Sequence, residues 1–584
     1  MKKYILILFL QVALAANEAY YTKIHISPAK KCLILEEPNR RTFKGLHSSD
    51  SNGLQVLRKP AVSVPSDVSE NSQDESEIIE IFARELILLE TYVDTICRIK
   101  ESVRSLSRHG QIMDELEILK IVDGGDPANR IDVVFMGDGY TLDERDQFFD
   151  DIRRLTIDMF NGDTFRSYLP LFNIWAVYVE SNSSGIGYNG ANDTPFRLYR
   201  EAGQLRAIYT ANAQYARQVC QSMGPGGCDY PSLIGNDDYY GGLGGEFVIS
   251  TKSDRTGTVV LRHEMGHSFI NVGDEYDNGP TYYGVNSAPS LNAVDTTWGH
   301  WLNSESLRVE RVTYRLLEYP WADLSDGEQS FTFVSDGQYS RWYLLLSVSA
   351  AGEEDSLEFL LDGEALPWAS RGSDDREFYD WYGSEGFPAG NHSFSVRSKT
   401  ASTNPDIPRM ICSVQLHEFG NEDEFTMDND HISAYPIWDE RRRVTYRPTN
   451  AGCLMRNMTT NQFCSVCKEG MWHQFLRRIS LIDDVEVSKV PIGDTKRVDL
   501  HTLKLGQLRE SGNEVADERL EVRWSHNGQE QPQLNNQFEI DAKVGTWSVN
   551  VQLISNEVRN DPNALLQDTS HFTVTLPANS TIPQ

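Results

Sequence analysis

The sequence predicts a multidomain α+β protein, and three observations lead to this fold class. At 584 residues the chain is too long for a single hydrophobic core. Between residues 131 and 179 a strand, a helix and a second strand follow one another, which is typical of an α/β domain with a mixed sheet. Residues 304–432 and 484–584 contain short strand patterns separated by turn signals, which indicate β-sandwiches.

The beginning of the chain and its charge restrict where the protein works and what it binds. Residues 1–16 have two lysines, an apolar run and a small-x-small site, so we expect a signal peptide and a secreted, extracellular protein. No later segment is long and apolar enough to predict a membrane span. With 54 basic and 85 acidic residues, the net charge of -31 argues against nucleic acid as a partner.

The N-terminal region, residues 17–127, is the least informative. Ile24–Leu35 suggests one or two strands, and residues 46–76 have the composition of a linker. Apolar residues from Ile78 to Ile96 recur at helical spacing and predict a long amphipathic helix. The helix either packs on a core or belongs to a propeptide, in which Cys32 or Cys97 could block a metal; a Cys32–Cys97 disulfide is the alternative.

The α/β domain opens with an apolar strand at Ile131–Tyr140. Thr141 and Glu144 then form a capping box for a helix, and a second strand is expected at Phe172–Val179. The glycine-rich stretch 241–250 leads into a further strand, which either pairs with an extended peptide substrate or is an ordinary core strand.

The most informative motif is His-Glu-Met-Gly-His at residues 263–267. Residues four apart in a helix lie on one face, so His263 and His267 can bind the same metal ion. Two imidazoles, a third ligand and a water make an open zinc site, and Glu264 can reach that water as a general base. The motif therefore predicts a catalytic Zn²⁺ centre.

The third ligand must follow the helix. Asn tolerates the left-handed conformation, so we expect Asn271 to turn the chain and present Asp274 to the metal. A carboxylate is an acceptable zinc ligand. Glu275 is the nearest alternative, and His300 is a more distant one.

The eight cysteines of an exported chain favour disulfides. Cys220 and Cys228 flank a turn-rich loop that a disulfide could close. Cys464 and Cys467 have a metal-binding spacing, but no second Cys-x-x-Cys faces them, so we expect disulfides that involve Cys453, Cys464 and Cys467. Glycosylation sequons, which predict a glycoprotein, begin at Asn182, Asn192, Asn391, Asn457 and Asn579.

Several blocks together resemble the immunoglobulin A metallopeptidase family, which consists of secreted zinc peptidases. The resemblance covers roughly 128–303 and 433–480, somewhat under half of the chain, and it implies a zinc endopeptidase. The blocks are Val133–Tyr140, Phe172–Ser184, His263–Tyr276, Trp298–Leu302, Tyr446–Thr449 and Cys453–Cys467.

Cys453–Met458 resembles the Met-turn that underlies the metal in metzincins, with Met455 or Met458 as its methionine. We therefore expect a metzincin-like zinc peptidase domain over residues 128–303 and 433–483. Tyr276, His300 and Tyr446 are candidates for stabilising the oxyanion.

Residues 304–432 depart from the family pattern and predict an inserted, jelly-roll-like β-sandwich. Its aromatic residues either line a glycan site or are half-buried strand residues. We expect the insertion to recruit or screen large substrates without touching the zinc, while residues 484–584 form an immunoglobulin-like accessory domain. The aromatic residues are Trp368, Tyr379, Trp381 and Tyr382.

The sequence thus predicts a secreted, zinc-dependent endopeptidase that hydrolyses extracellular proteins or glycoproteins. Its ligands are His263, His267 and Asp274, and Glu264 is its general base. The alternative is an inactive peptidase fold that acts as a glycan- or protein-binding adhesin.

Overall fold

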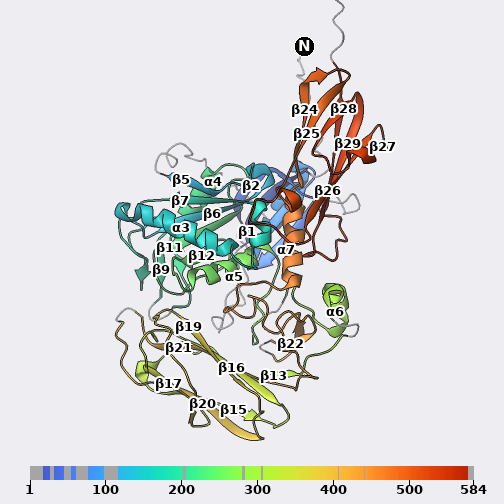
Figure 1. Cartoon of the computed structure of the whole chain (residues 1–584). Helices are drawn as coiled ribbons and strands as arrows, with labels where there is room; N and C mark the ends of the chain where they lie inside the picture. The colour runs from blue at the N-terminus through green and yellow to red at the C-terminus, as the bar shows by residue number, and fades with distance from the viewer. Residues whose placement is uncertain are drawn as a thin grey trace, which may run out of the picture.

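The computed structural model shows a multidomain protein that is rich in β-sheet (Figure 1). No helix among the described residues is long and apolar enough to cross a membrane. The structure describes residues 18–26, 32–44, 54–60, 77–97, 116–201, 205–278, 283–303, 307–404, 407–439 and 441–576. The expected signal peptide at residues 1–16 and the sequon at Asn579 lie outside these ranges.

An antiparallel sheet near the N-terminus has the order β2-β1-β4-β3. The predicted helix over Ile78–Ile96 is wrong in its first part, because Ile78–Phe82 lies in a strand paired on both sides. Its β-branched residues are buried between these neighbours, which outweighs their helical spacing. The third strand also falls within the expected linker. The elements are β1 (Glu18–Ile26), β2 (Cys32–Thr42), β3 (Leu54–Pro60), β4 (Glu77–Ala83) and α1 (Leu86–Cys97).

A five-stranded mixed sheet of order β12-β11-β6-β7-β5 occupies the middle of the molecule (Figure 1). Only β5 runs antiparallel to its neighbour. The two strands predicted from residues 131 and 172 onwards are present, as is the capping box of Thr141 and Glu144. The strands are β5 (Glu117–Val122), β6 (Ile131–Asp138), β7 (Phe172–Tyr178), β11 (Tyr230–Gly235) and β12 (Val248–Thr251).

Helices cover both faces of this sheet. Successive side chains of its strands point to opposite faces, and both sets are apolar and buried. Val133 and Phe135 of β6 pack with α3 and α5, whereas Val134 and Met136 pack with α4 on the other face. The helices are α3 (Arg145–Phe160), α4 (Ala213–Ser222) and α5 (Gly257–Phe269). The remaining elements of this part are β8 (Gly187–Tyr188), β9 (Leu198–Arg200), β10 (Tyr209–Thr210), α6 (Leu291–Thr297), β22 (Tyr435–Trp438), β23 (Val444–Arg447) and α7 (Ser465–Arg478).

Between residues 312 and 419 two antiparallel sheets enclose one hydrophobic core. Three of the four candidate sugar-binding aromatic residues, Trp368, Tyr379 and Trp381, pack on this core around Phe359, whereas Tyr382 is exposed. The first sheet contains β13 (Val312–Glu318), β14 (Ala322–Asp323), β16 (Arg341–Val348), β19 (Glu377–Gly383) and β21 (Met410–Phe419). The second contains β15 (Gln329–Ser335), β17 (Leu357–Leu361), β18 (Glu364–Ala365) and β20 (Gly390–Ser398).

Two further antiparallel sheets follow α7 and share a continuous core with the mixed sheet. Trp524 and Val551 belong to the same buried cluster as Trp472 and Phe475 of α7. The strands are β24 (Ile482–Ile492), β25 (Thr495–Thr502), β26 (Arg519–His526), β27 (Gln529–Glu530), β28 (Glu539–Lys543), β29 (Gly545–Ile554) and β30 (Gln567–Val574).

The cysteines are only partly paired as expected. The structure contains the disulfides Cys32–Cys97 and Cys220–Cys228. The prediction that a free Cys32 or Cys97 thiolate blocks a metal is therefore wrong, because the two residues are bonded to each other. The expected disulfides at Cys453, Cys464 and Cys467 are also wrong, because all three are buried free thiols, as is Cys412.

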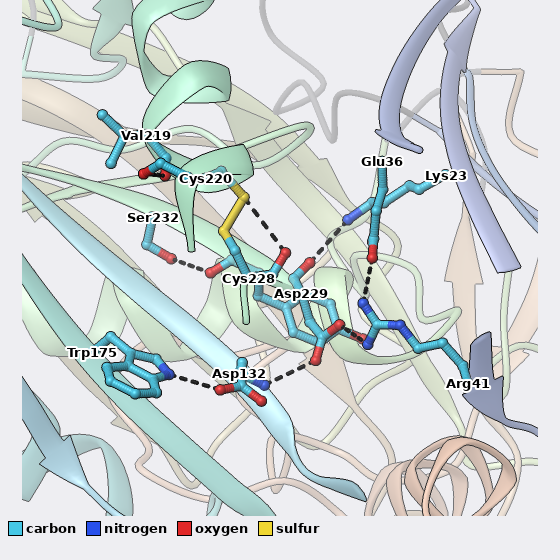
Figure 2. Close-up of a disulfide and its surroundings, with 12 residues drawn as sticks. Lys23, Glu36, Arg41, Asp132, Trp175, Val219, Cys220, Cys228, Asp229 and Ser232 are labelled. Atoms are coloured by element: carbon cyan, nitrogen blue, oxygen red, sulfur yellow. Dashed lines mark hydrogen bonds and ion pairs between the residues drawn. A yellow bond between two sulfur atoms is a disulfide. The ribbon is translucent and has the colours of Figure 1, made fainter. Parts of the chain in front are cut away.

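Buried charges hold the N-terminal sheet on the mixed sheet (Figure 2). Lys23 donates to the Asp229 carbonyl oxygen at 3.1 Å, and Arg41 forms an ion pair with the Asp229 carboxylate. Asp229 also accepts from the backbone of Asp132 at 2.9 Å, and Trp175 donates to the Asp132 carboxylate at 2.7 Å. Removal of residues 17–127 as a propeptide would therefore expose buried charge; that removal stays a prediction.

Candidate metal and catalytic site

The site is built on α5, a helix that is buried along most of its length. His263 and His267 stand one turn apart on the same face, as predicted, with their Nε2 atoms 3.3 Å apart. Glu264 lies beside them and is 9% exposed. The helix therefore presents two imidazoles and one carboxylate from a rigid, buried element.

Asp274 completes this cluster. Its Oδ1 lies 3.0 Å from Nε2 of His263 and 3.2 Å from Nε2 of His267. The expected left-handed turn at Asn271 is wrong, because this residue does not have a positive φ. Instead the helix ends at Ile270 in an extended conformation, and Val272 forms a bridge with Gly284 that directs the loop back.

The two alternative third ligands lie elsewhere. Glu275 is fully buried, and its Oε1 accepts from Asn286 at 2.8 Å. His300 lies 2.5 Å from the carboxylate of Glu469, which Trp301 also contacts at 2.9 Å. The structure thus brings only Asp274 to the histidine pair.

The orientation of the imidazoles fits a metal ion. Nδ1 of His263 is 3.3 Å from the Leu454 carbonyl oxygen, and Nδ1 of His267 is 3.0 Å from that of Val272. A carbonyl oxygen only accepts, so each Nδ1 is placed to donate its proton there, which directs each Nε2 toward Asp274 and leaves it to a metal ion. Donors bound tetrahedrally at about 2.0–2.1 Å would be about 3.3 Å apart, close to the separations between these three atoms.

The electrostatics of the cluster also favour a cation. Burial lowers the pKa of His267, but the Asp274 carboxylate outweighs burial and raises this pKa to about 9. Burial raises the pKa of Asp274, but His267 and His263 outweigh it and lower that pKa well below its usual range. Without a metal the cluster retains a proton, which a metal ion must displace.

Met455, one of the two methionines proposed for a Met-turn, lies directly beneath the helix. A Cβ on Gly266 would be 3.0 Å from its Cε and 2.8 Å from the ring of Phe463. Met455 is fully buried. Met458 is instead part of a pocket wall, with its Sδ 3.8 Å from the Tyr240 hydroxyl.

His263, Glu264 and Asp274 open into a pocket of about 90 Å³. We expected the insertion to act without touching the zinc. Its residues form part of the lining of the same pocket, so it lies closer to the site than this expectation implies. The sequence has no signal for this contact, since the wall residues come from separate strands and from the segments that connect them. They include Tyr319, Trp321, Leu345, Arg376, Phe378 and Gln415.

A buried charge network joins this wall to the loop that carries Asp274. The Asp277 carboxylate lies 3.0 Å from Nε2 of His417 on β21 and 2.8 Å from Nη2 of Arg456. Arg456 also donates to the Glu275 carbonyl oxygen at 2.6 Å. The sequence does not predict this network. Asp277 and His417 are 140 residues apart, and Arg456 lies in the Cys453–Met458 segment, whose resemblance to a Met-turn concerns its methionines.

Tyr276 is the one oxyanion candidate in the pocket. Its ring stacks over His263 at a centroid distance of 6.2 Å, and its hydroxyl is buried without a hydrogen-bond partner among the described residues. His300 is bound to Glu469 instead. Tyr446 belongs to β23, which pairs with β22 and bridges to Ala288.

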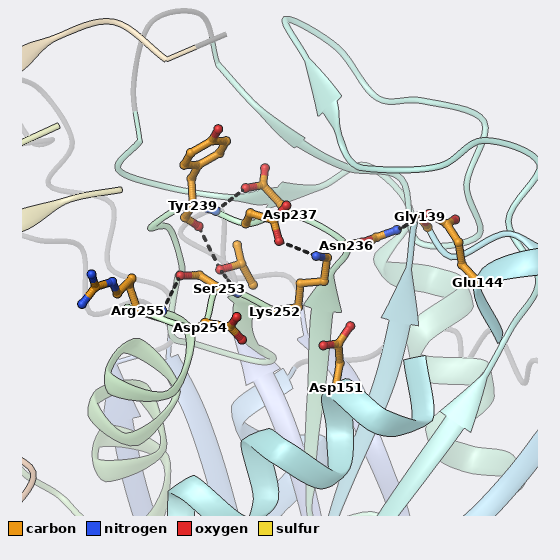
Figure 3. Close-up of polar contacts among 12 residues, drawn as sticks. Gly139, Glu144, Asp151, Asn236, Asp237, Tyr239, Lys252, Ser253, Asp254 and Arg255 are labelled. Carbon is orange, nitrogen blue, oxygen red and sulfur yellow. Dashed lines mark hydrogen bonds and ion pairs between the residues drawn. The ribbon is translucent and has the colours of Figure 1, made fainter. Parts of the chain in front are cut away.

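The pocket is also lined by Tyr240, whose ring lies 4.6 Å from the guanidinium of Arg376 and which belongs to a loop held by polar contacts (Figure 3). Asn236 donates to the Gly139 carbonyl oxygen at 2.8 Å, and the backbone of Tyr239 donates to Asp237 at 2.8 Å. Thr251 donates to the Tyr239 carbonyl oxygen at 2.8 Å, which ties the loop to β12.

The edge of β12 is already occupied beside this loop. Leu243 and Ile249 exchange backbone hydrogen bonds of 3.1 and 2.9 Å. A peptide substrate therefore cannot pair with Ile249 while these bonds persist, which favours the interpretation of an ordinary core strand after the glycine-rich stretch.

Three solved structures of carbohydrate-active proteins share low similarity with the chain, and no curated protein matches it. A family 35 carbohydrate-binding module from Clostridium thermocellum is 10% identical over 18% of this chain and 88% of its own, with a TM-score of 0.13. A GH2 β-galacturonidase from Eisenbergiella tayi is 8% identical over 47% of this chain and 44% of its own (TM-score 0.13). A cycloisomaltooligosaccharide glucanotransferase from Paenibacillus sp. is 8% identical over 67% of this chain and 52% of its own (TM-score 0.13). Scores this low support no conclusion.

Residues 119–298 match the model of the IgA peptidase M64 family. This range contains β6, β7, β11 and β12, part of β5, α5 and Asp274. It indicates a peptidase and supports the use of a metal ion. Together with the resemblance found in the sequence, the match over this part of the chain supports a relationship to the immunoglobulin A metallopeptidase family.

Proposed function

We propose that this chain is a secreted, zinc-dependent endopeptidase with a metzincin-like catalytic domain over residues 128–303 and 433–483. The observation that carries the proposal is the mutual spacing of 3.0–3.3 Å among the donor atoms of His263, His267 and Asp274. Zinc accepts this combination of two imidazoles and a carboxylate. A bound zinc would supply an activated water and polarise the carbonyl of the scissile bond.

The remaining work falls to side chains of the pocket. Glu264 takes a proton from the water and delivers it to the leaving amine. The free hydroxyl of Tyr276 donates to the developing oxyanion. Leu454 and Val272 hold the His263 and His267 rings through their carbonyl oxygens, so that both Nε2 atoms point to the same place.

The substrate is an extracellular protein or glycoprotein. The pocket wall formed by the insertion contributes aromatic side chains and Arg376, which suit an extended peptide with apolar residues. The two disulfides support an extracellular location. An inactive, glycan-binding adhesin is the weaker alternative, because Glu264 and both histidines are in place; glycan binding by the insertion remains separate and untested.

The test is cleavage of casein or gelatin by the purified full-length chain. We expect hydrolysis that stops with a chelator and returns with added Zn²⁺. Glu264→Gln provides the control for a contaminating peptidase, because it should bind zinc without cleaving. No metal-dependent cleavage by correctly folded, zinc-loaded protein would refute the proposal.

A further inference from the structure

A second group of possible metal ligands lies behind the catalytic helix. The Sγ atoms of Cys453, Cys464 and Cys467 all lie within 4.8 Å of one another, and those of Cys453 and Cys467 are 3.8 Å apart. All three residues are buried, with Cys464 the most exposed at 6%. Cys453 begins the turn that contains Met455, whereas Cys464 occupies the N-cap position of α7 and Cys467 follows in the first turn of this helix.

The spacing suits a metal ion. Thiolates bound tetrahedrally to one zinc at about 2.3 Å lie about 3.8 Å from one another. Three thiols cannot all pair as disulfides, and the structure pairs the other close cysteines while leaving these free. We propose that Cys453, Cys464 and Cys467 bind a second, structural metal ion of thiophilic character, with zinc as the ion expected.

The cluster is prepared for deprotonation, which metal binding requires. The position of Cys464 at the N-terminus of α7 favours an anion. A metal ion would displace the thiol protons as it binds.

Three thiolates leave a fourth coordination position, for which Glu275 is the candidate. Its Oε2 is buried without a hydrogen-bond partner among the described residues, and its backbone donates to the Met455 carbonyl oxygen at 2.9 Å. Glu275 thus lies beside the turn that begins at Cys453, and a water is the alternative fourth ligand.

This metal would position the catalytic ligands without touching the substrate. Leu454, next to Cys453, offers the carbonyl oxygen that contacts Nδ1 of His263. The second metal would hold this turn against α7, which itself packs on α5. This consequence rests on the proposed role of His263, whereas the presence of the second metal does not.

The experiment is metal analysis of the full-length chain produced with zinc. We expect two zinc ions per chain in the natural sequence. One ion should remain in His263→Ala/His267→Ala and one in Cys464→Ser, and none should remain in the variant that combines these three substitutions. Cys412→Ser is the matched control, because Cys412 is also a buried free thiol but lies outside the cluster, and it should keep both ions.

A second measurement does not depend on the folding of a cysteine variant. In His263→Ala/His267→Ala, X-ray absorption at the zinc edge should show an ion bound by three sulfur atoms at about 2.3 Å. Finding no zinc in this variant, or a disulfide between any two of the three cysteines by non-reducing peptide mapping, would overturn the proposal. These outcomes do not involve activity, so they are separate from failure of the proposed peptidase function.

The coupling between the sites has its own readout. Cys464→Ser should weaken zinc binding at the histidine site about 10- to 100-fold, as loss of an outer contact to a metal ligand typically does. An unchanged affinity in Cys464→Ser would refute the positioning role.

Discussion

Two clusters of three potential metal ligands share the turn Cys453–Met455, and their surroundings differ. The cluster of His263, His267 and Asp274 opens into a pocket with Glu264 and the free hydroxyl of Tyr276. The cysteine cluster is buried between the same turn and the start of α7. Catalytic metal sites keep an open position, whereas structural sites are closed. The neighbours of a ligand set, more than its size, therefore indicate its role.

The largest expected effect comes from Glu264→Gln. Removing the general base should lower kcat by about 10²- to 10⁴-fold, while zinc stays bound at the histidine site because Glu264 is not a ligand. Peptide cleavage and metal content are measured on the same preparation. Undiminished turnover would mean that the open cluster, which consists of His263, His267 and Asp274, works without Glu264.

Next is Asp274→Ala, which removes a ligand from the open cluster alone. Zinc affinity there should fall by more than the roughly 10- to 100-fold typical of an outer contact, while the cysteine cluster keeps its ion. Equilibrium competition with a chromogenic chelator measures this, and the exposed Asp295→Ala is the control. Tight, stoichiometric zinc at the histidines would transfer the role of third ligand to another residue.

Tyr276→Phe tests what distinguishes the open cluster chemically. Loss of one oxyanion donor should lower kcat about 10²- to 10³-fold with little change in KM or metal content. Tyr446→Phe is the matched control, because Tyr446 belongs to the β22–β23 hairpin and should leave kcat unchanged. Equal effects of the two substitutions would contradict the assignment.

His417→Ala tests whether the insertion helps to build the open site. It removes a contact to the buried Asp277 carboxylate, which should cost about 1–3 kcal/mol of local stability. Because the insertion forms a pocket wall, kcat/KM should fall for a short peptide as much as for a large protein. A loss confined to large substrates would restore the expectation that the insertion acts away from the metal.

The smallest effect concerns a site remote from both clusters. Burial, and then the Asp229 carboxylate, raise the pKa of Asp132 from 3.8 to about 7. The folded state therefore binds this proton more tightly than the unfolded state, so the contribution of Asp132 to stability decreases as pH rises from about 4 to 7. Asp132→Asn should flatten the pH dependence of the unfolding free energy in this window, as measured by denaturant titration, without changing metal content. An unaltered dependence would contradict this role.

Local patterns in the sequence predicted the parts that local physics determines. The spacing of His263 and His267 on one helical face, the capping box at Thr141 and the strand at Ile131 all depend on nearby residues. Asp274 was found for an incorrect reason, since Asn271 makes no left-handed turn and the bridge from Val272 to Gly284 directs the loop.

Long-range packing accounts for the errors. Ile78–Phe82 has helical spacing but pairs with two strands, which only the assembled sheet reveals. The insertion lines the pocket through residues of strands and loops that are far apart in the sequence. The sequence favours disulfides over a metal site at Cys464 and Cys467 because no second Cys-x-x-Cys faces them, whereas folding brings the single Cys453 to the pair.

The most direct test of the central claim is a crystal structure of zinc-loaded, full-length Glu264→Gln, with anomalous diffraction recorded at the zinc edge. We predict a zinc peak bonded to Nε2 of His263, Nε2 of His267 and a carboxylate oxygen of Asp274, at the mouth of the pocket that contains Tyr276. A zinc-loaded crystal with no peak between these three residues would contradict the assignment of this site as the catalytic centre.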